Sequence, residues 1–313
     1  MSFTSDTRLE LARVPITRAR DAAAELCGAA LSCGGLSYRG PNRYALRIQT
    51  ESREILERHL SLFRRFLGVD ATMRVQHTDR LGGQAYYVLS MDDANTDRAI
   101  AELRLTDPEQ IFGIRQAPDL ALLTSDSERR ACFRGAFMLC GSISNPERSY
   151  HLEFTQASES FAQALCDIMA EYGLGVRLSR RKSQTVAYIK DGEAISTALT
   201  LMGASQARLR FEDVRALKSV RNDVNRQVNC DSNNMDKVVA AAEKQISMIR
   251  AIEKRLGMNG MPEPLREVAM MRLEYPDASL TELGGMLTPP LGKSGVNARM
   301  RKLEALAEDL VNG

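Results

Sequence analysis

Hydrophobic and polar positions follow the same succession of helix and strand periods twice within the first two hundred residues. The predicted elements are strands at 44–49 and 150–155, helices at 51–66 and 159–172, strands at 84–90 and 185–190, and helices at 99–105 and 194–202. Strand segments alternate apolar and polar residues, whereas helix segments repeat their apolar residues every three or four positions. The pattern therefore predicts two copies of one α+β unit.

A motif rich in small residues opens each copy. Leu26–Ser37 reads LCGAALSCGGLS and Phe133–Ser144 reads FRGAFMLCGSIS, and both align at a constant offset that matches Gly28 with Gly135. In each motif helix a small residue lies four positions before this glycine, on the same helical face, so another backbone can approach closely. We expect these two helices to form a central pair flanked by two sheets, which gives a pseudo-twofold domain.

The predicted organisation has four parts. They are an N-terminal lead-in at 1–16, the duplicated domain at 17–205 with repeats at about 17–105 and 125–205, a helical connector at 206–258, and a domain of three helices at 259–313. Within the connector, the Asn-rich segment SVRNDVNRQVNCDSNN precedes a helix that Asp231 or Ser232 can cap. Arg221 and Arg226 lie in this segment and are candidates for contacts with a nucleic-acid backbone.

The C-terminal domain has the pattern of a helix-turn-helix. Its second helix opens with the capping box formed by Ser279 and Glu282, and Ser294 can cap the third helix after Thr288-Pro-Pro290. The third helix has an apolar face, while Ser294, Asn297 and Arg301 lie on another face. This second face suits base edges in the major groove. The predicted DNA-binding residues are Ser279, Thr281, Lys293, Ser294, Asn297, Arg299, Arg301 and Lys302. A generic three-helix bundle is the alternative, and the turn LTPPLGK is longer than most helix-turn-helix turns.

A second group of cations occurs in the second repeat. The stretch from Leu174 to Lys190 contains no acidic residue. Its cations include Arg177, Arg180, Arg181 and Lys182. Such a run can follow phosphates. The alternative is a solvated hairpin, because the first repeat shows no comparable excess.

Composition and charge narrow the class of protein. The 313 residues are 44% hydrophobic and 26% charged, with a net charge of +2 and no apolar run long enough for a membrane span. The six cysteines include no C-x-x-C pair, which favours buried free thiols in a reducing cytosol over zinc or disulfide chemistry. We expect a cytoplasmic, nucleoid-associated protein without a membrane partner.

The duplicated half resembles the LAGLIDADG homing-endonuclease fold, in which a helix pair carries the motif and the two sheets straddle duplex DNA. That resemblance implies a metal-binding acid before the last glycine of each motif, but this chain has Cys33 and Cys140 there. Thiols are poor ligands for magnesium. Moreover, Glu153 of the second repeat is matched by Arg47 in the first. These departures predict a fold without nuclease activity and without a bound metal or cofactor.

The whole chain, in the same order of segments, resembles the WhiA family of bacterial regulators. The resemblance rests on the opening SFTSDTRLELARVP, the connector RNDVNRQVNCDSNN and the C-terminal run LREVAMMRLEYPDASLTELGGMLTPPLGKSGVNARMRKL. It implies a non-enzymatic regulator of transcription that binds double-stranded DNA in a sequence-specific manner, linked to sporulation, cell division and chromosome segregation. Two alternatives stay open: a LAGLIDADG endonuclease with relocated acids, and a protein-interaction scaffold whose partner is a regulatory protein.

Overall fold

The computed structural model describes residues 2–32, 35–40, 43–77, 85–107, 109, 113–156 and 158–312, with the side chains of 230–234, 311 and 312 outside the description. Its contacts divide the chain into two compact units, residues 1–218 and 219–313. The division falls inside the connector predicted at 206–258. Each unit has its own hydrophobic core.

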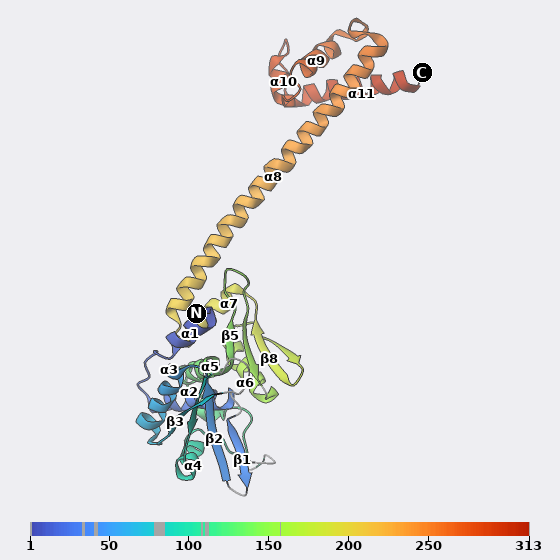
Figure 1. Ribbon diagram of the computed structural model, residues 1–313. Helices are drawn as coiled ribbons and strands as arrows, with labels where there is room; N and C mark the ends of the chain where they lie inside the picture. The colour runs from blue at the N-terminus through green and yellow to red at the C-terminus, as the bar shows by residue number, and fades with distance from the viewer. Residues whose placement is uncertain are drawn as a thin grey trace. The chain divides into compact units, whose positions relative to one another are not determined.

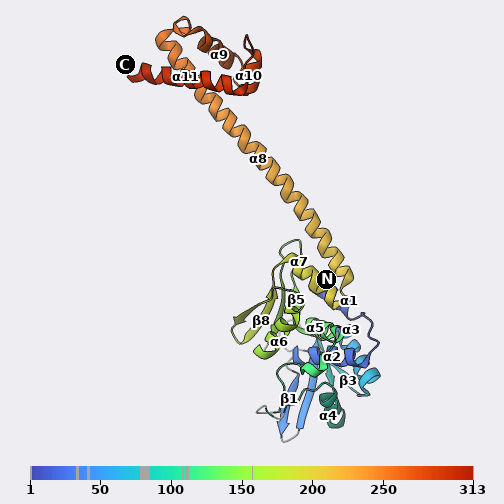
Figure 2. The same ribbon diagram turned by 180° about the vertical axis from the view of Figure 1, so that it is seen from behind.

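The first unit contains the predicted duplication (Figures 1 and 2). After α1 (Phe3–Leu11), the first repeat consists of α2 (Ala19–Ser32), β1 (Leu36–Gly40), β2 (Arg43–Thr50), α3 (Arg53–Leu62), a π-helical turn (Phe63–Leu67), β3 (Thr72–His77), β4 (Ala85–Ser90) and α4 (Asp93–Glu102). After a 3-10 turn (Leu120–Leu122), the second consists of α5 (Asp126–Cys140), β5 (Gly141–Ile143), β6 (Leu152–Gln156), α6 (Glu159–Ala170), β7 (Arg177–Arg181), β8 (Gln184–Ile189) and α7 (Gly192–Met202). The antiparallel sheets have equivalent strand orders, β1-β2-β4-β3 and β5-β6-β8-β7, so the duplicated α+β fold is confirmed.

Helices α2 and α5 pack directly on one another between the two sheets (Figure 1). A Cβ atom added at Gly28 would lie 2.2 Å from the carbonyl oxygen of Cys132, and one added at Gly135 would lie 2.0 Å from that of Glu25. Cys132 and Glu25 are themselves equivalent positions of the two repeats. The contact is therefore reciprocal, as a pseudo-twofold axis between the helices requires.

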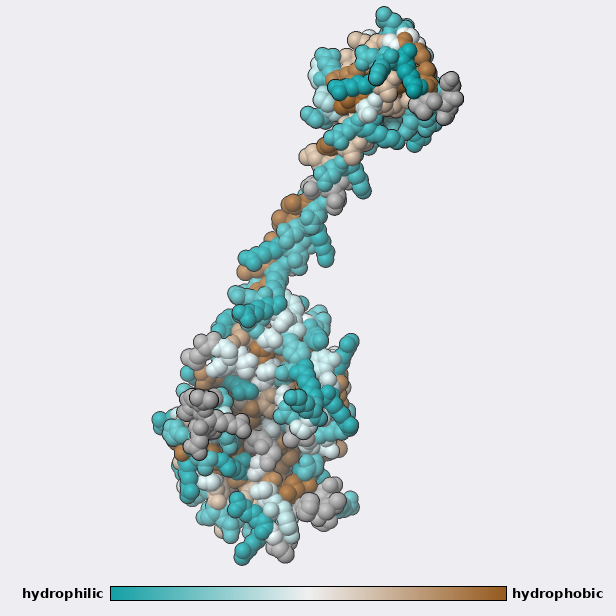
Figure 3. Space-filling view, turned by 45° about the vertical axis from the view of Figure 1, so that its right-hand side comes forward, coloured by the Kyte–Doolittle hydropathy of each residue, from teal (hydrophilic) through white to brown (hydrophobic). Residues whose placement is uncertain are grey.

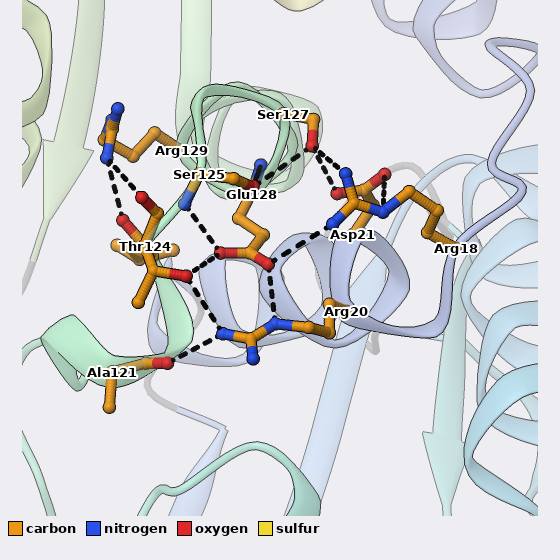
Figure 4. Close-up of polar contacts among 10 residues, drawn as sticks. Arg18, Arg20, Asp21, Ala121, Thr124, Ser125, Ser127, Glu128 and Arg129 are labelled. Atoms are coloured by element: carbon orange, nitrogen blue, oxygen red, sulfur yellow. Dashed lines mark hydrogen bonds and ion pairs between the residues drawn. The ribbon is translucent and has the colours of Figure 1, made fainter.

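A polar network joins the N-terminal ends of the two helices (Figure 4). Glu128 of α5 accepts hydrogen bonds from the Ser125 backbone at 2.8 Å and from Arg20 Nε at 2.6 Å. Ser125 and Glu128 form a capping box at the start of α5. Ser127 Oγ donates to Asp21 at 2.8 Å, so both helix starts share the network. Cap and ion pair together fix how α2 and α5 begin.

We expect the Glu128 network to make the first unit sensitive to acid. Burial raises the pKa of Glu128, but hydrogen bonds from Ser125, Thr124 and Arg20 outweigh burial and lower it to about 2. A depressed carboxyl pKa stabilises the fold above the unfolded value near 4.5 and ceases to do so as pH falls toward 2. Glu128→Gln should therefore lose about 2 to 3 kcal/mol at pH 7, allowing for the exposure of Arg20.

Urea denaturation of the wild type and Glu128→Gln across this pH range measures the effect. The two stability curves should converge as pH approaches 2. A constant difference between them would contradict the assignment of the stabilisation to the Glu128 charge.

The long helix α8 (Ser205–Leu256) differs from the sequence prediction. Asp231 and Ser232 lie within a continuous helix and do not cap a new one. The physical reason is that no glycine or proline occurs between Gly203 and Gly257, so nothing forces the backbone to break despite the Asn-rich composition. Gly257, with a φ of 69°, follows the last helical residue, Leu256.

The second unit is entirely helical. After a 3-10 turn (Met258–Gly260), it consists of α9 (Glu263–Glu274), α10 (Leu280–Met286) and α11 (Lys293–Asn312), which pack with the last turns of α8. Its core includes Ile249, Ile252, Val268, Leu283 and Leu303. Apolar side chains of the three C-terminal helices are thereby brought together in one core.

Candidate nucleic-acid interface

The long turn between α10 and α11 packs against α10. Gly284 of α10 lies against the turn, since a Cβ there would be 2.0 Å from the Leu291 carbonyl oxygen. The Leu291 N–H donates to the Gly284 carbonyl at 2.8 Å. Sequence reasoning missed the role of Gly284, for which the only signal is the Gly284-Gly285 pair within a predicted helix. The contact fixes α11 relative to α10.

Helix α11 has one buried and one exposed side. Val296, Met300 and Leu303 are buried in the core and form the apolar face that the sequence predicts for this helix. The exposed residues of the first three turns are Lys293, Ser294, Asn297, Ala298, Arg301 and Lys302. Because α11 begins at Lys293, Ser294 lies inside the first turn, and the prediction that it caps the helix is wrong. Its hydroxyl is on the exposed face instead.

Two arginines of the second unit form hydrogen bonds with other residues of that unit. Arg299, predicted to flank the recognition face, donates to the Pro264 carbonyl at 3.1 Å and to Glu267 at 3.2 Å. It thus joins α11 to α9. Arg272, which the sequence did not single out, is 2% exposed and donates to the carbonyls of Pro276 and Ala278. Burial lowers the pKa of Arg272, and its two bonds order the turn before α10.

The residues predicted on α10 have different environments. Ser279 Oγ accepts from the Glu282 backbone, and the Glu282 carboxylate accepts from the Ser279 backbone, so the predicted capping box is present. Hydrogen bonds from the Ser279 backbone and side chain to the Glu282 carboxylate lower the pKa of Glu282. Thr281 is exposed at the first turn.

The exposed face of α11 combines amide, hydroxyl and guanidinium groups with flanking ammonium groups. The stretch from Lys293 to Lys302 contains four cations and no acid. Asn297 and Arg301 are four residues apart and therefore project from one side of the helix. An asparagine amide matches the edge of adenine, and a guanidinium matches guanine. This chemistry suits a DNA major groove.

The cations of the second repeat lie on both faces of the strand. Arg177 and Arg181 are four residues apart on β7 and point to one face, where Arg181 forms an ion pair with Glu153 at 3.2 Å. Arg180 points to the other face and binds Glu159 of α6. Lys182 is at the hairpin turn with a φ of 56°. The stretch therefore does not form one continuous row of cations, because side chains alternate along a strand.

The two predicted cations of the connector lie on α8. Arg221 and Arg226 are both exposed. They are five residues apart, so they lie on different sides of the helix.

The nuclease position of the second repeat is filled by a thiol and its partners. Cys140 ends α5, with its Sγ 3.2 Å from the Ala136 carbonyl oxygen and 2.6 Å from Gln156 Nε2. Next to it, Arg8 of α1 donates to the Gly141 carbonyl at 2.6 Å. A cation and a thiol are unsuited to holding a magnesium ion, which prefers oxygen ligands. Cys33, the equivalent position of the first repeat, lies outside the described residues.

The sheet registers confirm that Arg47 and Glu153 are equivalent. Leu36 pairs with Leu46 in the first sheet, and Ile143 pairs with Leu152 in the second. The next residues along β2 and β6 are Arg47 and Glu153. One sheet thus has a cation where the other has an acid. Among the residues described, no cluster of three or more His, Cys, Asp or Glu side chains has the arrangement of a metal site.

No helix within the described ranges is long and apolar enough to cross a membrane.

Three family models match successive segments of the chain. The WhiA N-terminal LAGLIDADG-like domain matches residues 19–106, the WhiA LAGLIDADG-like domain matches 129–221, and the WhiA C-terminal HTH domain matches 224–307. The two LAGLIDADG-like matches coincide with the two structural repeats. The HTH match includes α9, α10 and α11 as far as residue 307.

Curated relatives match along nearly their whole length. The probable cell division protein WhiA of Heliobacterium modesticaldum is 41% identical over 98% of this chain and 96% of its own. The protein of the same name from Clostridium acetobutylicum is 37% identical over 99% and 98%. The crystal structure of full-length DUF199/WhiA from Thermatoga maritima has a TM-score of 0.59 at 21% identity and covers 99% of both chains. It supports the same fold.

Proposed function

The chain belongs to the WhiA family, and on that basis we propose that it is a sequence-specific DNA-binding regulator of transcription that reads duplex DNA with α11. The observation that carries this proposal is the exposed face of α11. Asn297 and Arg301 are free to reach base edges, because the core residues Val296 and Met300 hold the opposite side of the helix.

The proposed contacts divide into two kinds. Ser294, Asn297 and Arg301 contact bases in the major groove, whereas Lys293 and Lys302 contact phosphates on either side. Thr281 of α10 contacts the DNA backbone. Arg299 stabilises the orientation of α11 through Glu267. We propose Arg221, Arg226, Arg177 and Lys182 as further backbone contacts, and we assign Arg180 and Arg181 first to their ion pairs.

The cellular role follows from the relatives, which are named as cell division proteins. We propose that the chain controls genes of cell division, with sporulation and chromosome segregation as the wider processes that the family resemblance suggests. Because its target is chromosomal DNA, we propose the nucleoid, in the cytoplasm, as its place of action.

Arg301→Ala should weaken binding to the preferred DNA sequence by about 1 to 3 kcal/mol and relax the preference at one base pair. The preferred sequence is first selected from random duplexes by the wild-type chain. Titrations at fixed salt then compare the selected duplex with a scrambled one. Lys302→Ala is the matched control, since losing a phosphate contact should weaken binding to both duplexes alike and reduce the salt dependence. Unchanged affinity of Arg301→Ala for the selected duplex would refute the base contact.

We propose that the LAGLIDADG-like unit has no nuclease activity, as Cys140 and its neighbour Arg8 suggest. Incubation of the full chain with the selected duplex and magnesium or manganese tests this. Site-specific cutting that depends on the metal would establish the endonuclease alternative.

Whether this unit binds DNA itself or a regulatory protein is tested with Arg177→Ala/Lys182→Ala. We expect weaker binding of long duplexes by this variant. Unchanged DNA affinity would favour the protein-interaction alternative.

A further inference from the structure

Apolar side chains repeat every seven residues along the exposed part of α8. Leu217, Val224 and Val238 belong to one series with this spacing, and Val228 and Met235 belong to a second. These five side chains are between 46% and 67% exposed. Figure 3 shows brown hydrophobic side chains recurring along this helix. The two series interleave at steps of three and four residues, which is the heptad pattern of a coiled coil.

Leu217, Val224, Val228, Met235 and Val238 form an apolar stripe on α8. Within the described part of the chain, this stripe packs against no other hydrophobic side chains. The hydrophobic clusters there include α8 through Phe211 in the first unit and through Ile249 and Ile252 in the second. Between these points, the apolar face covers about 30 Å of helix at 1.5 Å per residue. Helices gain most of their stability by packing an apolar face, so this face is suited to a second helix.

The residues beside the stripe favour a second copy of the same chain. The positions that border a heptad seam often carry Glu or Lys, whose charges set which partner binds and in which orientation. Here those positions are almost all uncharged: Val220, Asn225, Gln227, Val239 and Ala241 border the stripe, and Lys218 is the exception at one end. Two identical stripes therefore approach each other without repulsion along most of their length.

The direction of pairing follows from Arg221, which occupies a seam position between Leu217 and Val224. In a parallel pair, Arg221 would meet the same arginine of the second copy. In an antiparallel pair centred on residue 226, Val224 meets Val228 of the second copy, and Leu217 meets Met235 of the second copy. Arg221 then lies opposite position 231, which is an aspartate in the sequence. Opposite charges across the seam favour this register.

We propose that two copies of the chain associate through α8 as an antiparallel coiled coil. The proposal is independent of the DNA-binding proposal, because pairing requires no DNA.

The mass of the full chain in solution, measured by sedimentation equilibrium without DNA, tests the pairing. The wild type should have twice the chain mass of 34.7 kDa. Val224→Asp/Val228→Asp places charges in the seam and should yield the single-chain mass. The control Asn222→Asp/Asn229→Asp adds the same charges on the opposite, exposed side and should keep the doubled mass. A wild-type chain that stays monomeric, or a seam variant that stays dimeric, would overturn the proposal.

Crosslinking tests the direction. A Leu217→Cys chain and a Met235→Cys chain with tags of different size, mixed and oxidised, should form a disulfide-linked pair that contains both tags. The wild-type chain, with its native cysteines, sets the background. In the antiparallel register the two copies of residue 217 lie about 27 Å apart along the helices, so efficient self-crosslinking of Leu217→Cys alone would indicate parallel pairing and overturn the antiparallel arrangement.

Discussion

Glu25→Ala lowers the free energy of unfolding by about 3 to 5 kcal/mol, which is the expected cost of leaving buried cations without their anion. Glu25 is fully buried in α2 and binds two arginines. Arg58 Nε and Arg134 Nε lie 2.5 Å and 2.6 Å from its carboxylate oxygens, and both arginine side chains are 9% exposed. Removal of the carboxylate leaves both guanidinium groups in the core.

The contacts of Glu25 explain why this loss is not local. Arg58 also donates to the Ala12 and Val14 carbonyls, and Arg134 donates to the Met202 carbonyl. The group therefore connects the segment after α1, both repeats and the end of α7. Burial raises the pKa of Glu25, but the hydrogen bond from Arg58 and the charges of Arg134 and Arg58 lower it further than burial raises it. The carboxylate accordingly stays charged at neutral pH.

Urea denaturation of the full chain measures the effect of Glu25→Ala, followed by a signal from the first unit. Glu57→Ala is the matched control, because it removes an exposed Glu–Arg pair with Arg53 on α3. Such a pair contributes about 0.3 to 0.5 kcal/mol. Similar losses in the two variants would show that the buried group is no more important than a surface pair.

Gly135→Val should destabilise the first unit by about 3 kcal/mol or more, and Gly28→Val should do the same. A Cβ at either position would meet a backbone carbonyl of the other helix at 2.0 Å or 2.2 Å. A backbone carbonyl cannot rotate away as a flexible side chain can. The helices must therefore move apart and weaken contacts along their whole interface.

Thermal and urea denaturation of both variants checks this expectation. Gly175→Val is the control, since no atom lies within 4 Å of a Cβ at that position. Equal stability of Gly135→Val and Gly175→Val would contradict the close helix contact. Because the contact is reciprocal, we also expect the two motif variants to lose similar amounts.

The sequence predicts those features that depend on local pattern. The equal spacing of Gly28 and Gly135 in two aligned motifs indicates the helix pair, and the capping box at Ser279 gives the start of α10. Roles that depend on distant partners are not visible in the sequence. Arg299 and Arg301 have the same local sequence pattern. Arg299 binds Glu267 of α9 inside the unit, whereas Arg301 is exposed. The buried role of Arg272 depends on a turn whose shape the sequence does not specify.

In the connector, the absence of helix-breaking residues predicts the continuous helix better than the Asn-rich composition does. The Asn-rich connector suggests a break near Asp231, but without glycine or proline the helix continues through it. The cations between residues 177 and 182 are likewise divided between two faces, because side chains alternate along the strand β7.

The opposite charges of Arg47 and Glu153 give the duplicated unit a direction. A perfect twofold repeat would present identical halves, and an elongated ligand with distinct ends would bind in either of two orientations with equal free energy. Here equivalent positions of β2 and β6 differ in sign, so the two orientations are no longer equal. The two halves of the scaffold are therefore related by fold and not by charge at this pair of positions.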